Sequence, residues 1–134
     1  MIKVLVVDDE EPFRRLLKNE LARKGYSVEV APDGAAALRL IRESAFDVLL
    51  LDIVMPGING IEVLENVKRI NPAIPVIILS AAGQTKTVVE AMKMGAADFL
   101  VKPFEEQELE LAIENVVEKQ KLKEEVKILK RRLD

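Results

Sequence analysis

Short apolar runs alternate along the chain with segments whose apolar residues recur every three to four positions. The runs are typical of β-strands, and the periodic segments are typical of amphipathic helices. The larger apolar residues at positions 12–24, for example, are predicted to share one face of a helix that Gly25 ends: Phe13, Leu16, Leu17 and Leu21. Strands are predicted at residues 2–7, 27–30, 48–51, 76–79 and 99–101, and helices at residues 12–24, 35–43, 61–70, 84–94 and from 105 onward.

Five strand–helix units in this order predict an α/β fold, with a doubly wound parallel sheet, helices on both faces and right-handed crossovers. The runs at 48–51 and 76–79 are apolar throughout, as in central strands covered on both faces. A length of 134 residues suits one domain. No apolar run is long enough to span a membrane and no signal peptide is indicated, so we expect a cytoplasmic protein without membrane contact.

The amino-acid composition excludes several kinds of functional site. The chain has no Cys and no His, which excludes disulfides, thiolate nucleophiles, imidazole bases and Cys or His metal sites. Residues 1–117 hold 13 Lys and Arg against 19 Asp and Glu, a net charge of −6, whereas residues 118–134 have a net charge of +3. An acidic body makes direct nucleic-acid binding there unexpected.

Acidic and polar residues follow several of the predicted strands, at the edge where parallel α/β sheets hold their functional groups. They are Asp8, Asp9, Asp52, Ser80 and Lys102. One Asp at a strand end is more often a helix cap or a turn former. Three carboxylates at one edge repel one another unless they are protonated or neutralised, and Mg²⁺ suits such an oxygen-only cluster.

A cation beside an ammonium group can hold a phosphoryl group. Without Cys or His, Asp52 is the natural nucleophile, Ser80 can donate a hydrogen bond to a phosphoryl oxygen, and Lys102 can form an ion pair with it. Lys102 also precedes Pro103, and this bond is a candidate cis peptide.

Four segments together resemble the receiver domain of two-component response regulators, over about residues 1–117. They are VVDDE at 6–10, LLDIVMPGING at 50–60, LSAA at 79–82 and GAADFLVKPF at 95–104. The resemblance implies a flavodoxin-like sheet of order 2-1-3-4-5. It further implies that Asp52 accepts a phosphoryl group from a sensor histidine kinase. In that family Mg²⁺ is held by residues matching Asp8, Asp9, Asp52 and the backbone carbonyl of Val54, and Lys102 bridges to the phosphoryl group.

Ser80 and Phe99 match the family's switch pair, which remodels the face of the fourth helix, fifth strand and fifth helix. Without the resemblance, Phe99 would be assigned to the core. Such a domain is a phosphoacceptor that catalyses only its own phosphorylation and slow dephosphorylation, not an enzyme with a separate substrate. Pro12 lies one position later than the family's proline. Val54 and Ala82 cannot orient an attacking water, so we expect slow loss of the phosphoryl group.

Residues 118–134 continue the last helix beyond the receiver segment as a helical linker. Leu122, Val126, Leu129 and Leu133 are spaced 4, 3 and 4, and Ala112, Asn115 and Lys119 continue that register backward. This pattern favours a parallel two-stranded coiled coil and hence a homodimer, through this helix, the switch face, or both. A solvated, frayed helix is the alternative. Contact with DNA is not favoured, because the tail has no aromatic residue.

The tail and residues 87–96 look like the receiver and linker of sigma-54-dependent transcriptional activators. Those proteins continue into an AAA+ ATPase and a DNA-binding domain. Neither a GxxxxGK[ST] loop nor a helix-turn-helix follows residue 117 in this chain. The alternative is a stand-alone receiver that acts by protein–protein contact.

Three other classes fit less well. A flavodoxin-type cofactor binder needs a Ser, Thr and Gly phosphate loop, where this chain has Asp8 to Glu11. A phosphohydrolase of the haloacid dehalogenase class needs an acid two residues after its nucleophile, where this chain has Val54. A pure interaction module would not need the acidic cluster.

Overall fold

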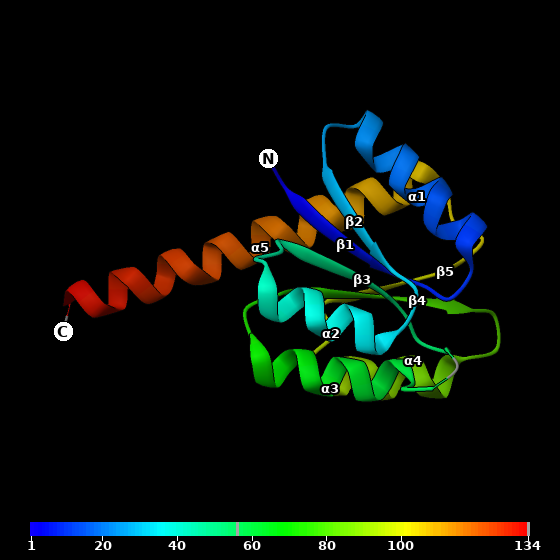
Figure 1. Cartoon of the computed structure of the whole chain (residues 1–134). Coiled ribbons are helices and arrows are strands. Elements are labelled where there is room, and N and C mark those ends of the chain that lie inside the picture. Colours follow the sequence, from blue (N-terminus) through cyan, green and yellow to red (C-terminus); the bar gives the residue numbers. More distant parts are fainter. Residues whose placement is uncertain (56, 134) are drawn as a thin grey trace.

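The computed structural model describes residues 1–55 and 57–133. Pro56 of the motif at 50–60 and Asp134 at the end of the tail lie outside this part. Five strands form one parallel sheet of order β2-β1-β3-β4-β5 (Figure 1), which confirms the predicted fold class and strand order. The strands are β1 Lys3–Val7, β2 Ser27–Ala31, β3 Val48–Asp52, β4 Val76–Ala81 and β5 Asp98–Lys102.

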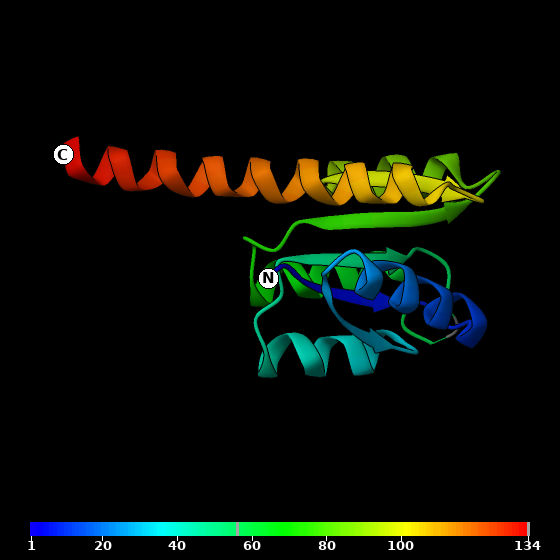
Figure 2. The same cartoon turned by 90° about the horizontal axis from the view of Figure 1, so that it is seen from above.

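Helices cover both faces of the sheet, with α2, α3 and α4 on one side and α1 and α5 on the other (Figures 1 and 2). The helices are α1 Glu11–Arg23, α2 Gly34–Glu43, α3 Gly60–Ile70, α4 Thr85–Lys93 and α5 Glu106–Leu133. The predicted elements are all present, with ends displaced by one or two residues. The extension of β4 to Ala81 places Ser80 inside the strand.

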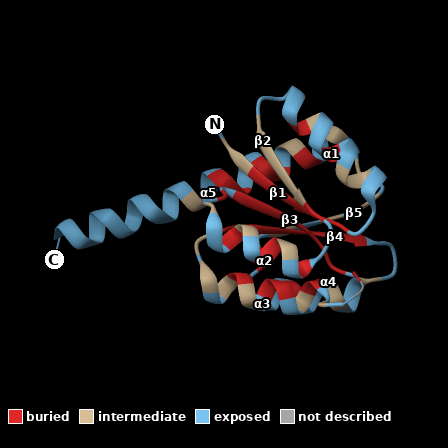
Figure 3. Cartoon of the chain, in the orientation of Figure 1, coloured by how far each residue is buried: buried red, intermediate tan, exposed pale blue. Residues whose placement is uncertain are grey.

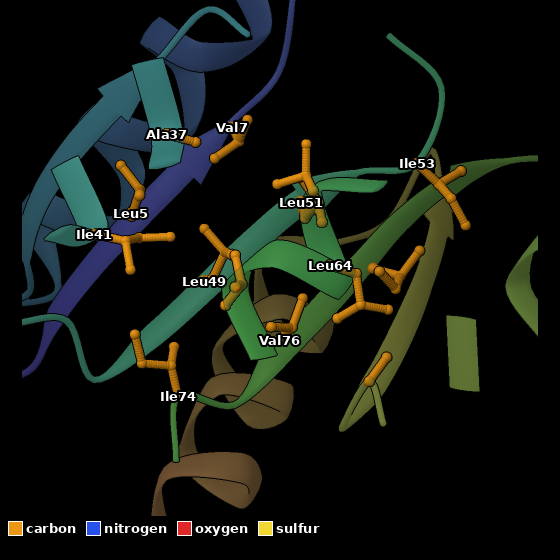
Figure 4. Packing of buried hydrophobic residues seen from close by; sticks show 14 of the residues in the cluster. Leu5, Val7, Ala37, Ile41, Leu49, Leu51, Ile53, Leu64, Ile74 and Val76 are labelled. Atoms are coloured by element: carbon orange, nitrogen blue, oxygen red, sulfur yellow. The ribbon is translucent and has the colours of Figure 1, made fainter. Parts of the chain in front are cut away.

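The two faces of the sheet have separate apolar cores, because successive strand residues point in opposite directions. In β1, Leu5 and Val7 pack toward α2 and α3, whereas Val4 and Val6 pack toward α1 and α5. Figure 4 shows the first of these cores, including Leu49 of β3 between its neighbours. Full burial of one such side chain stabilises the fold by about 1.5–3 kcal/mol. The two cores thereby fix the strand ends relative to one another.

A close backbone approach sets the course of the loop after β3. A Cβ atom on Gly60 would lie 2.5 Å from the Cα atom and 2.6 Å from the carbonyl oxygen of Ile53. The amide of Gly60 donates a hydrogen bond to that oxygen at 3.1 Å. The Asn59 side chain caps α3 by accepting a hydrogen bond from the Glu62 amide. The start of α3 is therefore fixed directly against the end of the strand that carries Asp52.

Helix α5 has two halves with different surroundings. Its first half buries a stripe against the sheet, and its second half extends past the domain with exposed side chains (Figure 3). Ala112 belongs to the buried stripe, at 5 % exposure. The backward extension of the coiled-coil register through Ala112 is therefore wrong, because that residue already packs against the core. The residues of the seam further on, Leu122, Val126, Leu129 and Leu133, are exposed.

Among the described residues, no helix has the length and apolar character needed to cross a membrane.

Candidate functional site

The residues predicted from the strand ends gather at the carboxyl edge of the sheet. Asp8 follows β1, Asp52 ends β3, Ser80 lies near the end of β4, and Lys102 ends β5. Asp8, Asp52 and Ser80 are 0 %, 7 % and 1 % exposed, and they are the buried polar side chains in the part of the chain that the structure describes. Burial of polar groups is unfavourable unless they are paired. Their concentration at this edge therefore marks it as the candidate functional site.

Lys102 is shared between two buried carboxylates. Its Nζ atom lies 2.8 Å from Oδ2 of Asp8 and 3.8 Å from Oδ2 of Asp52. The bond between Lys102 and Pro103 is cis, as the sequence suggested. One ammonium group therefore faces two carboxylates, with the exposed Asp9 beside them, and the negative charge of the site is not balanced.

The other carboxylate oxygens are held by the backbone. Oδ1 of Asp8 accepts a hydrogen bond from the Glu10 amide at 2.9 Å, and Oδ1 of Asp52 accepts one from the Val54 amide at 3.1 Å. Arg14 donates from Nη1 to the Asp8 carbonyl oxygen at 2.7 Å, which ties α1 to the end of β1. These bonds orient both carboxylates toward Lys102.

Burial raises the pKa of Asp52 from 3.8 to about 6. The Val54 amide and Lys102 lower this pKa, and the negative charges of Asp8 and Asp9 raise it, but desolvation is the largest effect. Ionised Asp52 is thus less favourable in the folded chain than in water.

Three acidic residues could hold a metal ion at this edge. Asp8, Asp9 and Glu10 each offer a carboxylate oxygen, and these atoms lie within 4.8 Å of one another. Such a set suits a hard divalent cation such as Mg²⁺, and the uncompensated charge around Asp52 favours one. Asp8 and Asp9 were expected in this role, and Asp52, which was also expected, is not part of this group of three. Glu10 was not expected, although its place next to the acidic pair is a signal that could have identified it.

Phe13 is a further member of the site that the sequence did not reveal. Its ring centroid lies 4.2 Å from Nζ of Lys102, a cation–π contact, and Phe104 packs edge-on against it at 6.0 Å. The helical pattern assigned Phe13 only to the buried face of α1. The contact joins two segments about ninety residues apart, and no local signal in the sequence indicates such a pair.

Ser80 and Phe99 lie on a hollow between α4 and β5, which we call the α4–β5 hollow. It has a volume of about 660 Å³ and is also lined by Val88, Val89, Met92 and Val101. Ser80 donates from Oγ to the Leu100 carbonyl at 3.4 Å, a long hydrogen bond. Phe99 is 43 % exposed and therefore not a core residue. The side chain lies outward because β5 is an edge strand.

The raised pKa of Asp52 predicts a pH-dependent effect of Asp52→Asn. An acid with a higher pKa in the folded state is destabilising once ionised, so stability is lost as pH rises through both values. At pH 7 to 8 without divalent cations, we expect Asp52→Asn to increase the free energy of unfolding by about 1–3 kcal/mol. The gain should shrink below a pH of about 6 and vanish below 3.8, where Asp52 is protonated in both states.

Urea unfolding at several pH values measures this difference. Glu43→Gln is the matched control, because Glu43 is an exposed carboxyl at the end of α2, away from the carboxyl edge of the sheet. If Asp52→Asn is no more stable than the parent at pH 7, ionised Asp52 does not destabilise the fold and the prediction is wrong.

Comparison with known proteins agrees with this geometry. The model of the response regulator receiver domain family matches residues 4–114. The regulatory protein AtoC of Escherichia coli is 36 % identical over 95 % of this chain and 28 % of its own length. The transcriptional regulatory protein ZraR of Klebsiella oxytoca is 40 % identical over 92 % of this chain and 28 % of its own length. This chain thus spans little more than a quarter of these relatives.

Two solved structures have the same fold over nearly the whole chain. NtrX from Brucella abortus, solved in complex with ADP, superposes with a TM-score of 0.92 and 37 % identity, covering 96 % of this chain and 30 % of that one. A response regulator receiver domain protein from Clostridium thermocellum gives a TM-score of 0.88 and 35 % identity, covering 91 % and 98 %. On the family match, the strand order and the residues at the sheet edge, this chain belongs to the response regulator receiver domain family.

Proposed function

We propose that this chain accepts a phosphoryl group on Asp52 from a sensor histidine kinase, with Mg²⁺ as cofactor. The observation that carries the proposal is the burial of Asp52 beside Asp8, with Lys102 as their shared counter-charge. A carboxylate so placed is a nucleophile, and its negative charge favours a cation that can also offset the charge of an incoming phosphoryl group.

In the transfer, a carboxylate oxygen of Asp52 forms a bond to phosphorus while the bond from phosphorus to the kinase imidazole nitrogen breaks, and the electron pair stays on that nitrogen. The Val54 amide orients the attacking carboxylate through its hydrogen bond to Oδ1. Lys102 is close enough to Asp52 to turn from it toward a phosphoryl oxygen. Mg²⁺, held by Asp8, Asp9, Asp52 and the Val54 carbonyl, with Glu10 near, would offset the phosphoryl charge.

Ser80 and Phe99 form the switch. Within the described part of the chain, the Ser80 hydroxyl makes only a long hydrogen bond, to the Leu100 carbonyl, so little opposes its turning toward new phosphoryl oxygens. Phe99 lies beside the α4–β5 hollow, into which an inward turn of the ring is possible. A phosphoryl group adds about −1.5 to −2 charges and strong acceptors, enough to bias such a two-state edge. The remodelled surface is the face of α4, β5 and α5.

This chain spans little more than a quarter of the length of its curated relatives AtoC and ZraR. AtoC and ZraR are named as regulatory proteins and are more than three times as long as the matched segment. We propose that the full regulator continues into an AAA+ ATPase and a DNA-binding domain and activates sigma-54-dependent transcription. A stand-alone receiver that acts by protein contact is the second candidate, since the α4–β5 hollow is an apolar surface open to a partner.

The exposed half of α5 supports a homodimer. Leu122, Val126 and Leu129 lie at 4 and 3 residue spacing and are each at least half exposed. A parallel two-stranded coiled coil would cover them. The same alignment brings Glu118 next to Lys123 of a second copy and Glu125 next to Lys130, so opposite charges flank the seam.

The phosphoacceptor is tested by intact mass after incubation with acetyl phosphate and Mg²⁺. We expect a gain of one phosphoryl group in the parent chain and none in Asp52→Ala or with a chelator. Glu62→Ala, which removes an exposed carboxyl of α3, should gain the group normally. Phosphorylation of Asp52→Ala to the parent's extent would overturn the assignment.

The apolar residues at positions 54 and 82 predict a long-lived phosphoryl group. Val54 is 55 % exposed beside Asp52, and a polar side chain there could orient a water molecule. We expect Val54→Asn, or Ala82→Asn, to release inorganic phosphate several times faster than the parent, measured after removal of the donor. Leu16→Asn, an exposed apolar residue on α1, is the control. Unchanged release from both site variants would count against this explanation.

The dimer is tested by sedimentation equilibrium. Leu129→Asp should shift the chain toward monomer, because it places a charge in the apolar seam. Ile128→Asp is the matched control, since Ile128 is similarly exposed on the same helix but lies outside the seam spacing. Equal behaviour of the two variants would mean that these leucines do not form a coiled coil.

A further inference from the structure

A second hollow lies at the opposite end of the sheet from Asp52. It is bounded by the end of α3, the loop before β4, the end of α4 and the middle of α5, and its volume is about 360 Å³. Pro75 and Ala97 on its wall directly precede β4 and β5, so it lies at the amino edge of these strands. Neither the phosphoacceptor site nor the switch uses it.

Three lysines line this hollow, Lys68 from α3 and Lys119 and Lys123 from α5. No Asp, Glu or Arg is among the described residues that line it. Lys68 is half-buried and donates from Nζ to the Ile74 carbonyl at 3.3 Å, and none of the ion pairs in the described part of the chain involves it. We call this place the lysine hollow.

None of the described residues that line the lysine hollow supplies a counter-charge. Desolvation lowers the pKa of Lys68, and the positive charge of Lys123 lowers it further. A buried charge is costly unless it is paired, so an anion between these ammonium groups would relieve both effects. Lys68 donates one hydrogen bond in the structure, and an ammonium group has three protons to donate.

We propose that the lysine hollow binds a small anion that carries a phosphate group. Three ammonium groups match a multiply charged anion better than a single carboxylate. Lysine binds phosphate as a point charge, whereas planar recognition of a carboxylate typically uses Arg, which is absent here. The volume is at the lower end of that of small-molecule pockets, and Met92 and Val116 supply apolar walls.

An anion in the lysine hollow would connect the exposed second half of α5 to the face formed by α4, β5 and α5. It would contact α3 and α5 at once and hold the start of the exposed part of α5 against the domain. Met92 lines both the lysine hollow and the α4–β5 hollow, so the two share a side chain. The geometry therefore makes the anion an effector of the position of α4 and α5, independent of phosphorylation.

Lys119, expected at a seam position of the coiled coil, is exposed and also lines the lysine hollow. The proposed coiled coil places Lys123 next to Glu118 of a second copy, so dimer formation and anion binding would compete for the Lys123 ammonium group, whereas Lys68 lies outside the seam.

The test is a titration of the ¹⁵N-labelled 134-residue chain with inorganic phosphate and with pyrophosphate, at constant ionic strength. A chelator and Asp52→Ala keep the acidic site out of the measurement, so the result does not depend on the proposed phosphorylation. We expect saturable shifts around Lys68, Ala97 and Lys123. Lys123→Gln should bind pyrophosphate at least about tenfold more weakly, since a charge-assisted bond is lost.

Lys127→Gln is the matched control, one turn further along the same exposed helix and outside the lysine hollow. It should bind as the parent does, and Lys119→Gln should weaken binding as Lys123→Gln does. Equal weakening in Lys127→Gln would mean unspecific attraction to the basic tail and would overturn the proposal. It would also be overturned by shifts that do not saturate with either anion, or by an acidic peptide that binds more tightly than pyrophosphate.

Discussion

One ammonium group shared between two buried carboxylates is the constraint on which the functional edge depends. Lys102 reaches Asp8 and Asp52 from the last strand of the sheet, and only the parallel arrangement of β1, β3, β4 and β5 brings these chain positions together. The two apolar cores hold the strands in that arrangement. The folded sheet thus holds more negative than positive charge at this edge. In the unfolded chain these carboxylates would be separated and hydrated.

That excess of negative charge is the reason we propose a cation site at this edge, where the cation would also offset the charge of a phosphoryl group on Asp52. Burial keeps the pKa of Asp52 high, so its charge is unfavourable until a cationic group offsets it. Two residues of α1 contact this site. Phe13 makes a cation–π contact with Lys102, and Arg14 donates a hydrogen bond to the Asp8 carbonyl. Helix α1 is therefore part of the site as well as of the core.

Much of the fold could be predicted because each strand–helix unit has its own local signal, such as the apolar run at 48–51 or the glycine that ends α1. The strand order came from the family resemblance, since alternation alone fixes no order. Contacts between distant segments were not predictable from either source. Phe13 under Lys102 is one, and Lys68 beside Lys123 is another.

Helix α5 shows the same limit. A heptad spacing continues through Ala112, but burial of that residue against the sheet depends on where the helix docks. Phe99 is the converse case, an aromatic residue in an apolar strand that stays exposed because the strand lies at the edge.

We propose that Mg²⁺ offsets the unbalanced negative charge of Asp8 and Asp52. Calorimetric titration of the chain with Mg²⁺ at pH 7 tests it most directly, with Asp8→Asn and Lys102→Gln as variants. We expect one Mg²⁺ per chain, binding at least about tenfold weaker in Asp8→Asn, and binding no weaker in Lys102→Gln, where a competing positive charge is gone. Equal affinity in the parent and Asp8→Asn, or no saturable binding by the parent, would contradict it.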